Sequence, residues 1–331
     1  LDANHRLSFE TRAVPRAQAG QVVVKIAANG ICGSDVHFFR EGRLGNFVVS
    51  RPYIPGHEAS GVICEVGAGV TGFQDGDRVV VEPGVACGFC EYCKSGRYNL
   101  CPDVVFLSAP PIDGTFCDYV AIDAHFVFPI PAALGLEEAA LVEPAAVAVH
   151  AVNRARFANG ASGAIVGAGP IGLFALQAFK AAGGGRAVVL DVLDSRLQTA
   201  KDLGADEVIN TRACQEAPHD LADVVFETAG NNAATETLFA LARPAGKVVQ
   251  VGWTNTPVVP MDIAKLMEKE IDYVGVNRYA NAYPAALQYL ADGRIDAKKF
   301  ITQRFPFDRA DQAFEFARDN PEKAVKVLVV N

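Results

Sequence analysis

The sequence predicts an α/β protein in which a doubly wound sheet of six parallel strands is joined to a second, mainly β domain. Three observations lead to this prediction. A glycine-rich motif, G-x-G-x-x-G, follows a short apolar run near the middle of the chain. Strand-like and helix-like segments alternate after the motif, whereas short strands and turns dominate before it. The 331 residues also exceed the size at which one hydrophobic core keeps growing, so two domains are expected.

Residues 1–130 have the pattern of a small barrel-like β domain. Short runs rich in Val and Ile are separated by Gly, Pro and Asp turns. We expect strands at 21–26, 59–66 and 77–81. At 131–150 the composition changes to an Ala-, Leu- and Glu-rich helix, which we interpret as the hinge between the two domains.

The glycine motif indicates a site for a dinucleotide. Gly167 permits a tight turn, Gly169 lets the backbone approach a pyrophosphate, and Gly172 lets the following helix pack on the preceding strand. The helix opens with Pro170 and Ile171, and its first N–H groups and positive dipole end attract phosphate. A glycine motif alone is a weak signal, but a strand before it and a helix after it make the interpretation specific.

Alternating segments continue to about residue 278. The second strand ends on Asp191, about 20 residues beyond the motif, which is where an acid binds the ribose of NAD. A later helix at 284–293 and a strand at 324–330 have no place in this sheet, so we expect them to return to the first domain. The expected domains are therefore 1–145 with 279–331, and 146–278. The expected strands of the sheet are 164–168, 186–191, 206–210, 222–228, 246–252 and 271–276, and the helices are 170–182, 194–203, 231–242 and 262–269.

Composition excludes several classes of partner. The net charge of −8 argues against nucleic acid and anionic membranes, which require clustered Lys and Arg. The uncharged stretch 157–179 is long enough to span a bilayer, but its glycines and proline fit a strand, turn and helix. No signal peptide opens the chain, although any leader before Leu1 is invisible in this sequence. Four of the eight cysteines cluster, which indicates metal binding in a reducing, cytoplasmic setting.

The clustered cysteines have the spacing C-x2-C-x2-C-x7-C. Four thiolates from one loop can surround a tetrahedral zinc ion and leave no vacant position, as in a structural site. An iron–sulfur cluster has an overlapping spacing, and four reduced thiols without metal are the third interpretation. The residues are Cys87, Cys90, Cys93 and Cys101.

A second set of ligands is dispersed along the chain. Cys32, His57 and Glu58 are ordinary residues when taken one at a time. Together with Glu143 they offer one thiolate, one imidazole and carboxylates. Such a set can hold zinc through three ligands and leave a position for water or substrate, which is the catalytic type of zinc site.

These motifs occur in an order that resembles a known family. The segments 30–37 (GICGSDVH), 56–61 (GHEASG) and 76–78 (GDR) come first, followed by the four-cysteine loop. Segments 96–102 (GRYNLCP), 141–144 (LVEP) and 167–172 (GAGPIG) complete the set. The chain resembles, over nearly its whole length, the zinc-dependent medium-chain dehydrogenase/reductase superfamily. Segments 109–114 (APPIDG) and 277–279 (NRY) are most similar to its sorbitol (L-iditol) and xylitol dehydrogenase branch.

The resemblance implies a GroES-like barrel followed by a Rossmann domain, with the C-terminal segment rejoining the barrel. It also implies roles at the catalytic centre. Cys32, His57 and Glu58 would ligate the catalytic zinc, and Glu143 would hold its water or ligate in some states. Ser34 would hydrogen-bond the reacting hydroxyl, and His37 would pass the proton to solvent.

The resemblance implies further roles in binding cofactor and substrate. Asp191 would bind the adenosine ribose of NAD with Arg196 near the same end, beside the glycine motif of Gly167, Gly169, Pro170, Ile171 and Gly172. Arg278 and Tyr279 would contact the tail of the polyol or order the water network.

Two differences from the family pattern leave the identity of the substrate open. Phe38 and Phe39 stand where polyol dehydrogenases commonly have Tyr-Trp, and Ala109 stands where a Thr is frequent. Phe38, Phe47 and Phe106 could then line a less polar pocket, which would favour a shorter or partly apolar diol. Alternatively, Arg278, Glu143 and waters bind the hydroxyls of the substrate, and the aromatic rings only line the pocket.

We therefore expect a polyol dehydrogenase with two zinc ions and NAD, which oxidises a secondary hydroxyl of a sugar alcohol or 1,2-diol to the ketone. An NADP-dependent ketose reductase and a threonine-type dehydrogenase are the enzymatic alternatives, and a recruited non-catalytic protein is the alternative of another class. Asp191 repels a 2′-phosphate, which disfavours NADP. The expected partners are a small-molecule substrate and identical subunits that pair along 271–276, with a tetramer favoured over a dimer.

Overall fold

The computed structural model describes residues 1–216, 218–254 and 256–331. The chain divides into two compact units, the first formed by Leu1–Glu143 with Ala297–Asn331 and the second by Pro144–Asp296. The first unit is therefore discontinuous in sequence.

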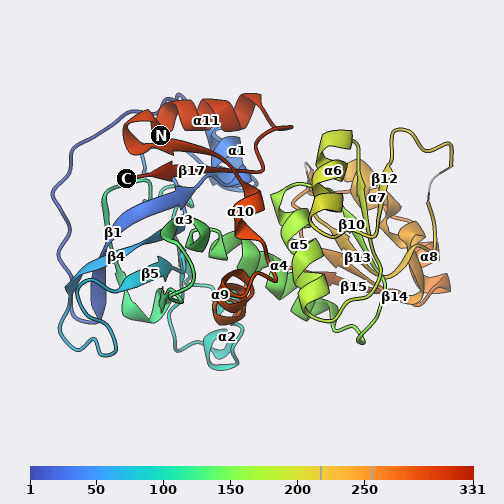
Figure 1. The fold of residues 1–331 in the computed structure, drawn as a ribbon, viewed down its shortest axis with the longest axis horizontal. Helices are drawn as coiled ribbons and strands as arrows, with labels where there is room; N and C mark the ends of the chain where they lie inside the picture. The colour runs from blue at the N-terminus through green and yellow to red at the C-terminus, as the bar shows by residue number, and fades with distance from the viewer. Residues whose placement is uncertain (217, 255) are drawn as a thin grey trace. The chain divides into compact units, whose positions relative to one another are not determined.

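The first unit is built on a seven-stranded sheet in which β1 (Gln21–Gly30) pairs with three others (Figure 1). Its antiparallel neighbours are β4 (Glu58–Val66), β8 (Tyr119–Asp123) and β17 (Lys326–Val330). This pairing places the last strand of the chain beside the first. The other strands of the sheet are β5 (Arg78–Val81), β9 (Val127–Pro129) and β16 (Ile301–Pro306), and two short hairpins are β2 (Arg43–Leu44) with β3 (Phe47–Val48) and β6 (Gly84–Val85) with β7 (Val105–Phe106).

Alternation along these strands explains the core of the first unit. Val22, Val24 and Ile26 point to one face of β1 and pack on Ile63 and Val79 of the neighbouring strands. A second cluster joins α11 (Ala310–Asp319) to β17. The remaining helices are α1 (Gly33–Glu41), α2 (Glu91–Lys94), α3 (Leu136–Ala139) and α10 (Ala297–Phe300), with short 3₁₀ turns η1 (Tyr98–Leu100), η2 (Ala124–Phe126) and η3 (Phe307–Arg309).

The second unit contains the predicted six-stranded parallel sheet, and that prediction is confirmed. The strands lie in the order β12-β11-β10-β13-β14-β15. Successive strands of the chain are thus added on one side of β10 and then, from β13 on, on its other side, as in doubly wound dinucleotide-binding folds. In Figure 1, α5 and α6 lie on one side of this sheet and α7 and α8 on the other. The strands are β10 (Gly163–Val166), β11 (Ala187–Asp191), β12 (Glu207–Asn210), β13 (Ala222–Glu227), β14 (Ala242–Gln250) and β15 (Asp272–Gly275), and the helices are α4 (Val142–Ala155), α5 (Pro170–Ala181), α6 (Asp194–Asp202), α7 (Asn232–Leu241), α8 (Ile263–Glu268) and α9 (Tyr283–Ala291). The first residues of α4, up to Glu143, belong to the first unit.

Residues 279–296, which we expected to rejoin the first domain, lie in the second unit. Their local contacts explain the difference. The N–H of Asp296 donates a hydrogen bond to Oε1 of Gln177 in α5, at 2.9 Å. The ring of Tyr279 packs against that of Tyr283 at the start of α9, with centroids 5.4 Å apart. The chain thus returns to the first unit only at Ala297.

No helix in the described parts of the chain is both long enough and apolar enough to cross a membrane. The uncharged stretch 157–179 accordingly forms β10, the glycine turn and most of α5.

Candidate active site and metal centres

Cys32, His57 and Glu58 come together in the first unit, with one potential ligand atom from each lying within 4.8 Å of the others. Cys32 caps the N-terminus of α1, directly after β1. His57 and Glu58 stand at the start of β4, which is antiparallel to β1 and aligns Glu58 with Gly30. The pairing of β1 with β4 therefore assembles this centre from residues about 25 positions apart in the sequence.

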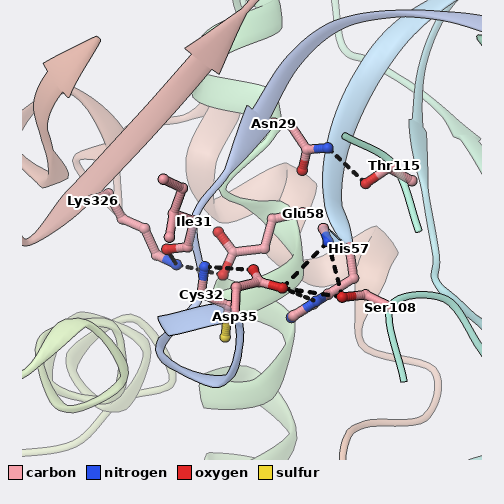
Figure 2. Close-up of polar contacts among 10 residues, drawn as sticks. Asn29, Ile31, Cys32, Asp35, His57, Glu58, Ser108, Thr115 and Lys326 are labelled. Carbon is pink, nitrogen blue, oxygen red and sulfur yellow. Dashed lines mark hydrogen bonds and ion pairs between the residues drawn. The ribbon is translucent and has the colours of Figure 1, made fainter. Parts of the chain in front are cut away.

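Asp35 organises the loops around this centre, although the sequence analysis assigned it no role (Figure 2). Its side chain is fully buried and accepts a hydrogen bond from the N–H of Cys32 at 3.0 Å. The hydroxyl of Ser108 donates to it at 3.0 Å, and the N–H of Gly56 at 3.3 Å. Its Oδ1 also lies 3.8 Å from Nδ1 of His57. An acid three residues after Cys32, in the first turn of a helix, was the signal that could have identified it.

Lys326 is the second residue that the sequence analysis missed. It is the first residue of β17, and its side chain is 3% exposed. Figure 2 shows its ammonium group directed at Glu58, to which it donates a short hydrogen bond. It also donates to the carbonyl oxygen of Ile31 at 3.3 Å. Glu58 is thus held in a buried ion pair as well as in the candidate ligand set.

The electrostatics of this centre favour a cation. Burial acts to lower the pKa of His57, but the Asp35 carboxylate and the Cys32 sulfur outweigh it and raise that pKa. Burial likewise acts to lower the pKa of Lys326, yet Glu58 and Cys32 raise it. Two buried bases therefore favour their charged forms, because the surrounding groups are negative.

The residues present fit a zinc ion. Nδ1 of His57 and Oε2 of Glu58 are buried and have no hydrogen-bond partner among the described residues. One thiolate, one imidazole and one carboxylate are donors that zinc accepts, and three protein ligands are typical of catalytic sites.

The proton-transfer residues expected from the resemblance lie on α1 and α4. Ser34 and His37 follow Cys32 within α1, where Ser34 is partly buried and the His37 side chain is 45% exposed. Nδ1 of His37 lies 3.7 Å from Oε1 of Glu41. Glu143 is buried in the first turn of α4, close enough to raise the pKa of His57 by its charge.

The three phenylalanines expected to line the pocket lie in different environments. Phe106 in β7 packs against the imidazole of His57, with ring centroids 5.6 Å apart. Phe47 in β3 is 40% exposed. Phe38 is 4% exposed and packs in a hydrophobic cluster with Tyr53 and Val49. Phe106 thus lies beside a candidate ligand, whereas Phe38 belongs to a hydrophobic cluster.

The four clustered cysteines also converge, as their spacing predicted. The Sγ atoms of Cys90 and Cys93 are 3.4 Å apart, and those of Cys87 and Cys93 are 3.9 Å apart. Backbone N–H groups point at the sulfurs, including that of Cys87 at 3.5 Å from Sγ of Cys101. The N–H of Phe89 acts to lower the pKa of Cys87 to about 7, whereas burial raises the pKa of the neighbouring Cys93 to about 12. Four thiols in this arrangement fit a closed structural zinc site.

In the second unit, the glycine motif forms the predicted turn between β10 and α5. Gly167 has φ +99°, a conformation that favours glycine. A Cβ atom on Gly172 would overlap the carbonyl oxygen of Gly167, so the close approach of helix to strand requires glycine there. Gly169 caps α5, and Pro170 and Ile171 are its first residues.

Asp191 ends β11 beside this turn and is already bound to backbone. Its Oδ2 accepts the N–H of Ala168 in the glycine turn at 2.7 Å, and its Oδ1 accepts those of Val192 and Leu193 at 2.7 and 3.0 Å. These bonds fix the carboxylate in place. Arg196 is partly buried in the first turn of α6, the helix that follows.

Arg278 and Tyr279 lie after β15, the edge strand of the second unit. Arg278 has φ +54°, and burial lowers the pKa of its guanidinium. Tyr279 is 3% exposed.

Comparison with known protein families gives two matches. The family described as alcohol dehydrogenase GroES-like domain matches residues 18–132, and the family described as zinc-binding dehydrogenase matches residues 170–292. The predicted combination of a GroES-like domain with a Rossmann domain is thereby confirmed.

Individual proteins are similar over almost the whole chain. A sorbitol dehydrogenase of Bacillus subtilis (strain 168) is 44% identical over 331 residues, covering 98% of this chain and 94% of that protein. The crystal structure of 2R,3R-butanediol dehydrogenase from Bacillus subtilis has a TM-score of 0.91 at 30% identity and covers 100% of this chain and 98% of that one. An alcohol dehydrogenase of E. coli CFT073, solved in complex with NADH, also has a TM-score of 0.91 at 30% identity, with coverages of 99% and 96%.

Proposed function

The chain belongs to the zinc-dependent medium-chain dehydrogenase/reductase superfamily, in its polyol dehydrogenase branch, and from this premise we propose that it oxidises a secondary hydroxyl of a sugar alcohol or 1,2-diol to the ketone with NAD. It is an oxidoreductase that acts on CH–OH donors. The observation that carries the specific proposal is the convergence of Cys32 with the buried His57 and Glu58, with Glu143 in the same unit.

In this proposal, Cys32, His57 and Glu58 hold the catalytic zinc, and Glu143 orients water or a hydroxyl beside it. Zinc, when bound there, supplies a Lewis acid that makes a bound hydroxyl more acidic. Ser34 would accept the hydroxyl proton at Oγ while it gives up its own hydroxyl proton, and the partly exposed imidazole of His37 would pass that proton to solvent. NAD, when bound, would supply the acceptor for the hydride of the carbinol carbon, and the protein would align that carbon with the nicotinamide ring and exclude water.

The cofactor proposal rests on the second unit. The glycine turn from Gly167 to Gly172 would hold the pyrophosphate, while Asp191 would accept hydrogen bonds from the ribose hydroxyls and Arg196 would lie near the same end. Support comes from the backbone bonds that fix Asp191. A fixed carboxylate cannot turn away from a 2′-phosphate, so NADP meets a charge repulsion.

Comparing the two cofactors tests this. We expect kcat/KM to favour NAD over NADP by at least about a hundredfold, which corresponds to about 2.7 kcal/mol. Asp191→Asn keeps the shape of the side chain but removes the charge, and it should narrow the preference. An unmutated protein that uses both cofactors equally well would contradict the assignment and would favour the NADP-dependent ketose reductase.

Two substrate classes compete within the proposal, and both have support. The similar sorbitol dehydrogenase favours a sugar alcohol, whose tail hydroxyls Arg278, Tyr279 and Glu143 would bind. The similar 2R,3R-butanediol dehydrogenase favours a short diol, as does the apolar ring of Phe106 beside His57, with Phe47 as a second candidate wall. In either class, a second hydroxyl can satisfy polar groups that a monoalcohol leaves unpaired, at about 1–3 kcal/mol for each lost partner.

The decisive experiment compares xylitol, sorbitol, 1,2-hexanediol and ethanol at one pH with NAD. We expect at least one polyol or diol to exceed ethanol by tenfold or more in kcat/KM. The relative rates with xylitol and 1,2-hexanediol then separate the two classes. If ethanol matches or exceeds every diol, the chain is a general alcohol dehydrogenase instead.

Self-association is part of the proposal. Strand β15 is the edge of its sheet, and exposed apolar residues lie near it in sequence, namely Trp253, Val258, Ile263, Met267 and Tyr273. An open edge with apolar surroundings favours pairing with a second copy. We expect a homo-oligomer, with a tetramer favoured over a dimer, which light scattering on purified protein would measure.

We also propose a cytoplasmic location. The support is the thiol content, because the eight cysteines are all unpaired in the structure. Five of them would have to remain reduced to hold the two metal ions, namely Cys32, Cys87, Cys90, Cys93 and Cys101. Cell fractionation of the producing organism with an antibody against the chain would test it.

A further inference from the structure

Lys326 is a buried cation that the proposed reaction does not yet use. Lysine is almost never fully buried unless it is paired, and here the ammonium group has Glu58 and the Ile31 carbonyl as its partners. Lys326 lies 268 residues after Glu58 and reaches it because β17 pairs with β1, which also pairs with β4. The pairing of these strands thus places a positive charge beside Glu58, a candidate zinc ligand.

Stability gives a poor explanation for this pair. The desolvation of two buried charges can exceed their mutual attraction, and apolar residues of similar volume often replace such pairs without loss. Two further acids at the centre are also buried: Asp35 and Glu143, like Glu58, are at most 5% exposed. With Cys32 as a thiolate, the centre holds four negative groups, which zinc alone does not neutralise.

The carboxylate of Glu58 is confined from two sides. Lys326 binds its Oε1, while a Cβ atom on Gly30 would overlap its Oε2. The glycine therefore leaves just enough room for the carboxylate against β1, and the lysine holds it there. Among the described residues, Oε2 of Glu58 has no hydrogen-bond partner, so Lys326 and the narrow space beside Gly30 are the constraints seen on the carboxylate.

We infer that Lys326 is a positioning residue that limits how strongly Glu58 binds the catalytic metal. By sharing the carboxylate and adding a positive charge, it keeps the zinc electron-poor and therefore able to activate a hydroxyl. This inference rests on the proposed function for its catalytic consequence, but the effect on metal binding follows from the charges alone. Removal of the lysine should strengthen zinc binding and weaken catalysis.

The test compares Lys326→Met, which removes the charge, with Lys326→Arg, which keeps it. Zinc retained per chain is measured after dialysis against graded concentrations of chelator. A cation close to a divalent metal weakens its binding, so we expect Lys326→Met to withstand about tenfold more chelator than the unmutated chain. Lys326→Arg should behave like the unmutated chain, as should Lys180→Met, which breaks the ion pair with Asp206 in the second unit.

Two further readouts separate positioning from mere structural damage. Cobalt substituted for zinc should give a different visible absorption spectrum in Lys326→Met, because Glu58 binds more strongly. With the best polyol found, kcat should fall about tenfold while the KM for NAD stays unchanged. Damage to the fold would instead weaken metal retention and raise both KM values.

Lys326→Gln covers the possibility that the methionine variant does not fold, since glutamine can still donate to Glu58. Tighter zinc retention in either uncharged variant supports the inference. Unchanged or weaker retention overturns it, and so does loss of folding in both uncharged variants while Lys326→Arg folds. A chain that oxidises no alcohol would refute the proposed function, but the retention measurement would still decide the role of Lys326.

Discussion

The two cysteine-containing centres of the first unit are assembled in opposite ways. All four thiols of one lie in the loop 87–101, and the backbone N–H groups of the same loop point at them. The other draws its ligands from the cap of α1 and the start of β4, and buried charged side chains surround it. The first is a local arrangement of identical ligands, whereas the second exists only once the sheet has formed. This difference indicates a structural role for the thiol loop and a reactive role for the mixed centre.

The largest expected effect separates the two centres by activity. Cys32→Ala removes the thiolate of the mixed centre, and we expect kcat to fall by at least about a thousandfold because the metal is lost or misplaced. The melting temperature should change by no more than a few degrees. Steady-state assays and calorimetry would measure both quantities. As a control, Cys64→Ala removes an exposed cysteine of the same unit that lies outside both centres. It should change neither kcat nor the melting temperature.

The next effect separates the centres by stability. Cys101→Ser removes one of the four thiols, and we expect the free energy of unfolding to fall by about 3 kcal/mol because a structural metal contributes directly to folding. Turnover per folded molecule should stay within about twofold of the original. Denaturant titration and elemental analysis would check this, with two zinc ions expected in the unmutated chain and one in this variant. If Cys101→Ser abolished turnover and Cys32→Ala mainly destabilised the fold, the two roles would have to be exchanged.

Glu82 links the two centres, so a pH effect tests whether they are independent. It accepts a hydrogen bond from the thiol loop, and the charge of Glu143 acts to raise its pKa. Its Oε1 accepts a hydrogen bond from the Tyr98 hydroxyl at 2.8 Å, and burial raises its pKa from 4.5 to about 7. Since the unfolded carboxyl ionises first, stability is fully present below about pH 4.5 and declines as the pH rises to about 7. The loss amounts to about 3 kcal/mol, as an order of magnitude.

Glu82→Gln should remove this decline, so the variant should gain stability relative to the unmutated chain at pH 8 but not at pH 4.5. Denaturant titrations at the two pH values would measure it. If the variant and the unmutated chain differed in unfolding free energy by the same amount at both pH values, Glu82 would not titrate in this range.

The smallest expected effect comes from the hydroxyl that reaches Glu82. Tyr98→Phe keeps the ring, which packs against Phe126, and removes the hydroxyl that donates to Glu82. We expect a loss of about 1 kcal/mol in unfolding free energy and no change in kcat. A marked fall in kcat would show that the thiol loop influences the catalytic centre, which would erase the distinction between the two.

The sequence predicted what depends on local pattern. The glycine turn with β10 and α5, the acid at the end of β11 and the convergence of the four cysteines follow from spacing within short segments. The alternation of strands and helices likewise predicted the six-stranded sheet. In each case the residues that interact lie close together or repeat with the period of a regular element.

What the sequence did not predict depends on contacts between distant segments. Lysine is normally a surface residue, so nothing near Lys326 indicates that it is buried against Glu58. Nothing near Phe38 indicates that its ring packs against that of Tyr53 in a hydrophobic cluster. We expected the chain to rejoin the first unit at residue 279, whereas it does so at residue 297. A helix that packs on the second unit has the same apolar pattern as one that packs on the first, so the sequence alone does not distinguish them.

The discontinuity of the first unit has a consequence for the order of folding during synthesis. A ribosome makes residues 144–296, which form a complete unit, before it makes β17. At about 5–20 residues per second, the nascent mixed centre spends about 10 seconds or more with its acids in place but without the lysine. During that interval β1 also lacks its neighbour β17 and has an open edge. The mixed centre is therefore completed last, and the strand that adds to β1 also brings its buried positive charge.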